Sequence, residues 1–96
     1  MRVVNHPEAE QELEEAALYY QDCAEGLGED FLDEFENTIR RIVESPERWA
    51  TIQENVRKVN FHRFPYAVIY QIRQGDIFII AVNHLHRRPF YWKRRI

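Results

Sequence analysis

The sequence has only one cysteine and lacks a long apolar run, which argues against a disulfide-stabilised secreted protein and against a membrane-spanning one. Cys23 has no partner for an internal disulfide, so we interpret it as a buried or half-buried thiol in a reducing compartment. No apolar stretch approaches the ~20 residues that span a bilayer. The first ten residues also lack the apolar segment of a signal peptide. We therefore expect a cytoplasmic protein with no membrane partner.

The charge is distributed unevenly along the chain. Its 96 residues, 45% of them hydrophobic, are enough for one folded domain that spans residues 1–96. Residues 1–50 carry 14 acidic residues and four arginines, whereas residues 51–96 carry two acidic residues and nine basic ones. The net charges of the two halves, −10 and +7, give the overall −3. The C-terminal half can therefore present a positive surface on a weakly acidic protein.

The first half of the chain has the periodicity of two amphipathic helices. Residues 7–24 place an apolar stripe at helical spacing, with Pro7 in the first turn: Ala9, Leu13, Ala16, Ala17 and Tyr20. Residues 29–44 repeat the pattern with Phe31, Phe35, Ile39 and Ile42. A short segment with two glycines separates them. This order predicts an antiparallel helical hairpin.

The second half changes to the spacing of β-strands. Residues 56–61, 66–73 and 76–83 are rich in β-branched and aromatic residues, and Val3-Val4 begins the chain in the same way. A turn at Gln74-Gly75 pairs Arg73 with Asp76 and Ile72 with Ile77. Residues 46–55 are interpreted as a connector. The predicted fold is α+β, in the order β-α-α-β-β-β: an N-terminal strand, the helical hairpin, then a three-stranded antiparallel sheet.

The predicted sheet is apolar on both faces, although two helices can cover only one. Simple alternation places Ala81 on the helix side and the following residues on the second face: Ala67, Ile69, Gln71, Phe78, Ile80, Val82 and His84. The C-terminal tail, a homodimer or a segment of a partner protein would each cover that face. In the last case Ile69, Phe78, Ile80 and Val82 would line the groove for the partner.

The C-terminal segment from residue 84 supplies the residue types of metal-independent RNA cleavage. Such cleavage needs a proton acceptor, a cation for the phosphate and a proton donor. His86 could be the acid or the base, Arg87 or Arg88 could bind the phosphate, and Tyr91 could stack a base or take part in proton transfer. The alternative is a solvated basic tail whose aromatic residues cap the core. The histidines fit no metal-ligand spacing, so neither a metal nor another cofactor is expected.

Further basic residues are candidates for a positive rim that contacts nucleic acid or a protein target. They are Arg57, Lys58, Arg63, Arg88, Lys93 and Arg94. The alternative is that they pair with the acidic helices, in ion pairs that contribute little at a surface.

The chain resembles the RelE/ParE superfamily of toxins from type II toxin–antitoxin modules. The resemblance runs through "A..EL.EAA.YY", "GLGEDFLDEFE", "P.RW", "VRKV.F.RFPYAVIYQI" and "AVNHLHRRPFYW..R". It implies a helical hairpin packed on an antiparallel sheet, and neutralisation by a cognate antitoxin whose C-terminal segment wraps the toxin. The RelE-like branch is implied to cleave mRNA on the ribosome, and the ParE-like branch to poison DNA gyrase.

Within this superfamily the sequence is closer to the ParE-like members. RelE-like enzymes have an arginine in a central "YR.VY" stretch, where this chain has Ala67 in "YAVIY". Loss of one phosphate-binding cation costs on the order of 2–4 kcal/mol of transition-state stabilisation. We therefore expect a toxin that inhibits gyrase or an unidentified target by binding. A ribosome-dependent mRNA endonuclease and a non-toxic scaffold of the same fold are the alternatives.

Overall fold

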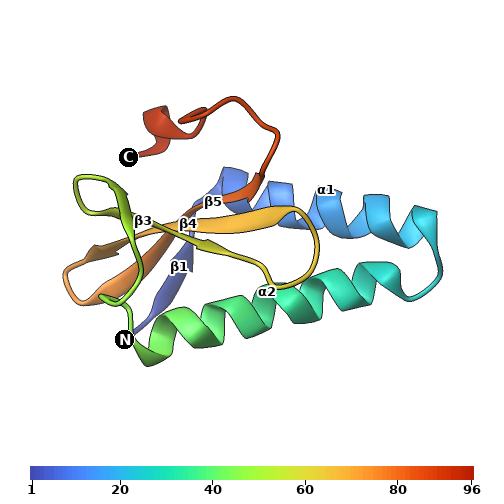
Figure 1. The fold of residues 1–96 in the computed structure, drawn as a ribbon, viewed down its shortest axis with the longest axis horizontal. Helices are drawn as coiled ribbons and strands as arrows, with labels where there is room; N and C mark the ends of the chain where they lie inside the picture. Colours follow the sequence, from blue (N-terminus) through green and yellow to red (C-terminus); the bar gives the residue numbers. More distant parts are fainter.

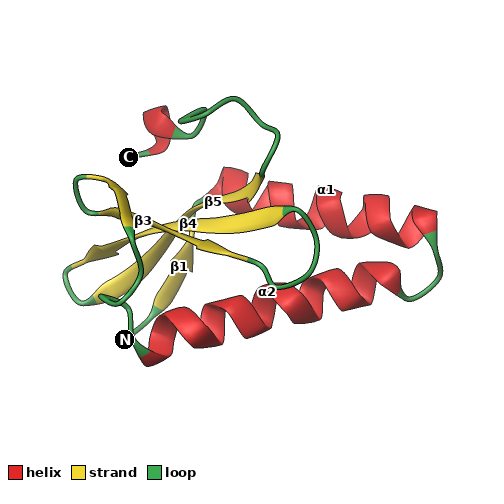
Figure 2. Cartoon of the chain, viewed as in Figure 1, coloured by secondary structure: helices red, strands yellow, loops and turns green.

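The computed structural model describes residues 1–96 as two helices, a five-stranded sheet and a C-terminal tail (Figures 1 and 2). The elements are β1 (Val3–Asn5), α1 (Pro7–Cys23), α2 (Leu27–Glu44), β2 (Thr51–Gln53), β3 (Val56–Asn60), β4 (Tyr66–Arg73), β5 (Asp76–His84) and the short 3₁₀ helix η1 (Lys93–Arg95). This confirms the α+β class and the helical hairpin.

Local chemistry sets the ends of the hairpin. The Nδ1 atom of His6 accepts a hydrogen bond from the Glu8 N–H at 3.0 Å and so caps α1, which begins at Pro7. At the other end, near the loop between the helices, the absence of a side chain on Gly28 lets α2 approach α1 closely. A Cβ at this position would lie 2.5 Å from the Ala17 carbonyl oxygen. Neither helix combines the length and the apolarity needed to cross a bilayer.

The sheet has the order β1-β5-β4-β3-β2. The predicted pairs Arg73–Asp76 and Ile72–Ile77 are confirmed. Two features differ from the prediction of a separate N-terminal strand and a three-stranded antiparallel sheet. β1 joins the same sheet, parallel to β5, and β2 forms within the expected connector. β2 has only three residues, too few for an alternating pattern to be visible in the sequence.

A β-bulge reverses part of the predicted alternation in β5. Ile69 is opposite Ala81 whereas Tyr70 is opposite Ile79, so Ile80 is the extra residue. Ala81 therefore lies on the second face with Ile80, and Val82 lies on the helix side. The placement of Val82 in a groove on the second face was wrong, since the bulge shifts every later side chain to the opposite side. His84 moves with it and its ring contacts Tyr66.

Each face of the sheet has its own apolar cluster. On the helix-side face, α1 and α2 pack on β3, β4 and β5 around 13 buried residues, and Phe31 contacts four aromatic rings. On the tail-side face, residues 85–96 cross the sheet and bring Trp92 onto Val56, Ile69, Ile80 and Ala81. Figure 1 shows the tail, in red, on the side of the sheet away from α2.

Cys23 differs from the expectation of a buried or half-buried thiol. It is the last residue of α1 and is exposed. The end of α1 beside the loop to α2 extends beyond the sheet (Figure 1), so nothing from the sheet covers the thiol.

Candidate functional site

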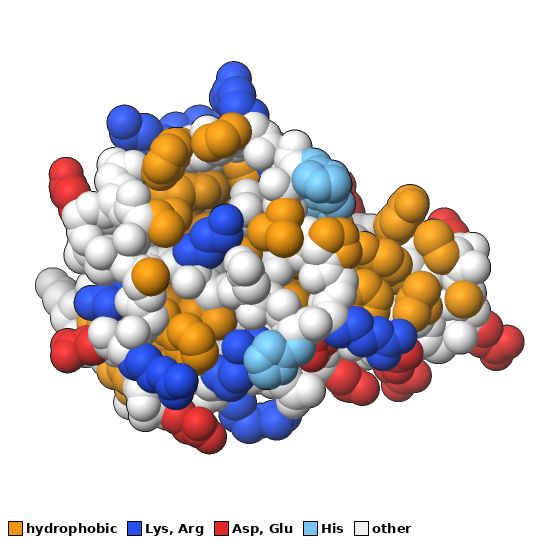
Figure 3. Space-filling model, in the orientation of Figure 1, with side chains coloured by type: hydrophobic (Ala, Val, Ile, Leu, Met, Phe, Trp, Pro, Cys, Tyr) orange, Lys and Arg blue, Asp and Glu red, His pale blue; other side chains and the backbone are white.

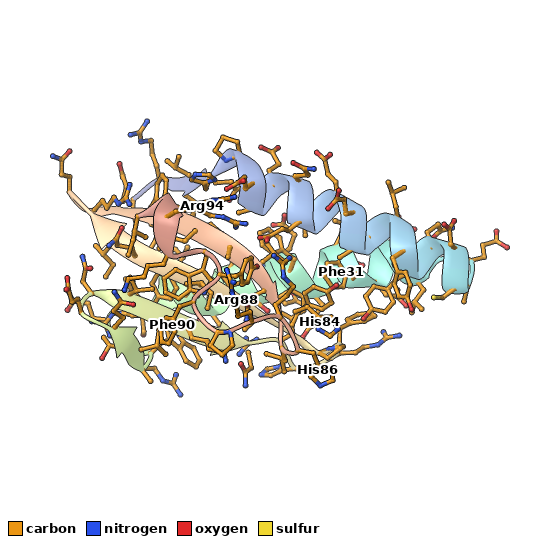
Figure 4. The ribbon with its side chains drawn as sticks, turned by 90° about the horizontal axis from the view of Figure 1, so that it is seen from above. Phe31, His84, His86, Arg88, Phe90 and Arg94 are labelled. Atoms are coloured by element: carbon orange, nitrogen blue, oxygen red, sulfur yellow. The ribbon has the colours of Figure 1, made fainter.

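The tail is fastened to α1 through two carboxylates, Glu8 and Glu12, of which Glu12 is the more buried and makes the most contacts. The Tyr91 hydroxyl donates a hydrogen bond to Glu12 Oε2 at 2.7 Å. The Arg95 guanidinium donates two more, to Oε1 at 2.9 Å and to Oε2 at 3.0 Å. Arg95 has 6% of its side chain exposed and Glu12 has 12%, so this is a largely buried, bidentate ion pair. Figure 4 shows the tail crossing the sheet, with Arg94 beside the start of α1.

The same two side chains complete the hydrogen bonding of β5. β1 pairs with residues 77–79 only, so β5 has no neighbouring strand on that side beyond the bulge. There Glu12 Oε1 accepts a hydrogen bond from the Val82 N–H at 3.0 Å, and Arg95 Nη1 donates to the Ile80 carbonyl at 3.1 Å. Sequence reasoning missed Glu12 and Arg95. The one available signal was an acidic residue beside the apolar stripe of α1.

The structure brings together two of the three residues proposed for nuclease chemistry. The Arg87 guanidinium lies 3.8 Å from the centre of the Tyr91 ring, and its Nη1 is 3.9 Å from Glu12 Oε2. Burial, followed by the hydrogen bond to Glu12, raises the pKa of Tyr91 well above its usual value. The Tyr91 hydroxyl is therefore a weaker acid than a free tyrosine and is already bound to a carboxylate.

His86 is placed differently from the other two. It is exposed, and its backbone N–H donates to Nδ1 of His84 at 3.0 Å. A cavity of about 180 Å³ between α1 and β5 is instead lined by His84, together with Glu12, Glu15, Tyr19, Tyr66, Val82 and Arg87. The histidine that shares a cavity with Arg87 is therefore His84.

The basic residues proposed for a positive rim fall into three groups. Arg57 donates to the carbonyls of Glu47 and Trp49, at 2.8 and 2.6 Å, and holds the connector in place. Arg63 pairs with Asp30 at 3.4 Å and Arg94 with Glu8 at 2.7 Å, as the alternative interpretation predicted. Lys58, Arg88 and Lys93 form no ion pair.

A second cavity of about 180 Å³ lies on the tail-side face, between the sheet and the tail. Ile69 and Trp92 are among its apolar lining residues, and the cations Lys58 and Arg87 line it too. Of the residues proposed for a partner groove, Ile69 lines this cavity. Phe78 and Ile80 belong to the cluster that packs around Trp92. Figure 3 shows Lys and Arg side chains between apolar patches on the face in view, with the acidic side chains toward its margins.

Comparisons with known proteins agree with this fold. Residues 3–89 match the family described as the ParE toxin of the type II toxin–antitoxin system parDE. Among solved structures, a chain of the "Chromosomal ParDE TA system from P. aeruginosa" aligns with a TM-score of 0.72 and 15% identity, over 90% of this chain and 97% of that one. No curated protein matches. With the family match covering all the strands and both helices, the chain belongs to the ParE toxin family of type II toxin–antitoxin systems.

Proposed function

We propose that this toxin inhibits its target, DNA gyrase first among the candidates, by binding and not by cleaving RNA. The toxin module and a cognate antitoxin follow from the family. The contacts of the Tyr91 side chain support the second part of the proposal, that the toxin does not cleave RNA. Its hydroxyl donates to Glu12 and its ring is covered by Arg87, so two of the proposed nuclease groups contact each other and a carboxylate.

The charges around Tyr91 are unfavourable for phosphoryl chemistry. Cleavage of RNA develops negative charge on the phosphorane, which free cations must stabilise. Glu12 places a carboxylate against the Tyr91 hydroxyl and shares the guanidiniums of Arg87 and Arg95. The central strand offers Ala67, buried and apolar, in the position where RelE-like enzymes have an arginine. These features favour action by binding.

Inducible expression of the chain, followed by assays of both targets, tests the proposal. We expect growth arrest, inhibition of DNA supercoiling by purified gyrase, and intact mRNA. His86→Ala should leave inhibition of gyrase unchanged. New mRNA 5′ ends on translated messages that disappear in Arg87→Ala, but persist in Arg88→Ala, would overturn it. Expression without any growth defect would favour the non-toxic scaffold.

Ribosome-dependent mRNA cleavage remains the second candidate because of one observation. The cavity beside α1 gathers His84, Glu12 and Arg87, which offer a proton acceptor, a carboxylate and a cation within one space. If cleavage occurs there, His84→Ala should abolish it and His86→Ala should not. That pattern would distinguish this cavity from the trio expected from the sequence.

A further inference from the structure

The tail-side cavity has apolar walls that the chain leaves partly exposed. Its lining includes Ile69 from β4 and Trp92 from the tail, both buried. Leu85 and Phe90 also line the cavity, and they are 40% and 46% exposed. Large apolar side chains around an open cavity of about 180 Å³ fit the insertion of an apolar side chain from another molecule.

The charge around this cavity has one sign. Lys58 and Arg87 line it. Lys58 forms no ion pair, and the Nη1 of Arg87 is 3.9 Å from a carboxylate that Arg95 and Tyr91 already share. Residues 51–96 contain only two acidic residues, Glu54 and Asp76, and Asp76 is paired with Arg2. A ligand that brings negative charge would meet the unpaired Lys58, and an Arg87 whose one carboxylate contact is long and shared.

One wall of the cavity is also strained. Phe90 has a φ of 60°, in the left-handed region that bulky residues rarely adopt. This conformation turns the tail so that the Phe90 ring lies 5.6 Å from the Trp92 ring, edge to face, and lines the cavity. Strain of this kind persists where the surrounding structure demands it and is found at ligand-binding segments.

We propose that this cavity is a docking site for the antitoxin, and that it receives one large apolar side chain from an acidic segment of that protein. Lys58 and Arg87 pair with carboxylates that flank the inserted side chain. The inference rests on the proposed function, because it assumes a cognate antitoxin. The sequence predicted that the partner would bind an open face of the sheet. The proposed site is smaller and is formed by the sheet and the tail together.

The lining favours a protein ligand over a nucleic acid. Sites for single-stranded nucleic acid stack bases on flat aromatic side chains along a positive groove. Here four of the nine lining residues are aliphatic, namely Ile52, Ile69, Leu85 and Pro89, against two aromatic ones, and the space is a pocket. A pocket with apolar walls and a charged rim is the form that side-chain anchors occupy at protein interfaces.

Binding of the toxin to the protein encoded by the reading frame next to its gene tests the inference. Lys58→Glu places a negative charge at the rim and should weaken binding by at least about tenfold. Lys93→Glu makes the same change in net charge outside the cavity, so its affinity should stay within about threefold of the original. Phe90→Gly removes one wall at a φ that glycine tolerates, and it should weaken binding without lowering the thermal midpoint.

Three outcomes separate the possibilities. Equal loss in Lys58→Glu and Lys93→Glu, or no loss in Lys58→Glu, would overturn the site while leaving the toxin assignment intact. If Lys58→Glu abolishes binding of a single-stranded RNA oligonucleotide and leaves antitoxin binding unchanged, the cavity binds nucleic acid and the proposal fails. If the unmodified chain inhibits growth and no neighbouring protein binds or neutralises it, the antitoxin assignment itself is wrong.

Discussion

The two faces of the sheet are covered in different ways. Helices of 17 and 18 residues cover the helix-side face, and the cluster between them and the sheet contains 13 buried residues. Residues 85–96 cover the tail-side face, where the cluster contains five. The first cover is held by apolar packing, whereas the second combines Trp92 with the ion pair between Glu12 and Arg95.

The tail is attached mainly through its side chains. Most of its backbone hydrogen bonds are local, such as Arg87 N–H to His84 and Arg95 N–H to Trp92, and Leu85 N–H to Pro65 joins it to the body of the protein. Ordering each residue costs roughly 1–2 kcal/mol, so a tail held by few anchors opens at lower free energy than the helices. The comparison therefore separates a face that maintains the fold from a face that can rearrange around a partner.

The largest expected effect comes from the helix-side cluster. Phe31→Ala removes a fully buried ring that contacts Tyr20, Phe61, Phe64 and Tyr66, and should lower the free energy of unfolding by about 3–5 kcal/mol. Its neighbour Leu32 is 39% exposed, and Leu32→Ala should cost less than about 1 kcal/mol. Urea denaturation measures both. Equal losses would show that the helices do not hold this face as described.

An intermediate effect is expected when the tail is released. Glu12→Gln removes the carboxylate that Arg95 and Tyr91 share, leaves the buried Arg95 with only the more exposed Glu8, and should cost roughly 2–3 kcal/mol, limited by detachment of the tail. Glu8→Gln is the matched control, because Glu8 contacts the same Arg95 but is 40% exposed, and it should cost less than about 1 kcal/mol. Hydrogen exchange should quicken in residues 85–96 and at Val82 in Glu12→Gln while the helices stay protected. Uniform loss of protection would contradict the separation of the two faces.

Alkaline pH provides a smaller and more gradual test of the helix-side face. Burial raises the pKa of Tyr70 from 10.0 to about 12, although Arg57 opposes this. Between these values only the unfolded state loses its proton, so stability is complete below pH 10 and falls as pH rises through about 12. The loss is on the order of 2 kcal/mol. Urea midpoints at the two ends of this window measure the loss. Tyr70→Phe should reduce the pH dependence without removing it, because the pKa values of Tyr20, Tyr66 and Tyr91 are raised too. An unchanged slope in Tyr70→Phe would contradict this cause.

The sequence predicted the elements that follow from local periodicity. The apolar stripe from Ala9 to Tyr20 and the turn at Gln74-Gly75 lie where the spacing indicated. It misplaced Val82, because alternation carries no sign of a bulge at Ile80. It could not predict that Glu12 meets Arg95, 83 residues away, because such a contact depends on the path of the tail over the finished sheet.

The candidate site also depends on tertiary contacts that the sequence does not reveal. The residue types around Tyr91 suit binding first and catalysis as the alternative, and the structure adds what each side chain already contacts. Arg63 and Arg94 pair with the acidic helices, whereas Lys58 lines a cavity without an ion-pair partner. Charge alone placed all three in one group.

Fluorescence of Trp92 in the free chain tests most directly whether the tail covers the second face of the sheet. Trp49→Phe leaves Trp92, which is 2% exposed, as the only tryptophan. We predict blue-shifted emission and weak quenching by acrylamide, both lost when Glu12→Gln is added while the far-UV circular dichroism of the helices persists. If Trp92 in the Trp49→Phe chain is quenched as strongly as free tryptophan, the tail does not cover that face and the docking cavity it forms does not exist.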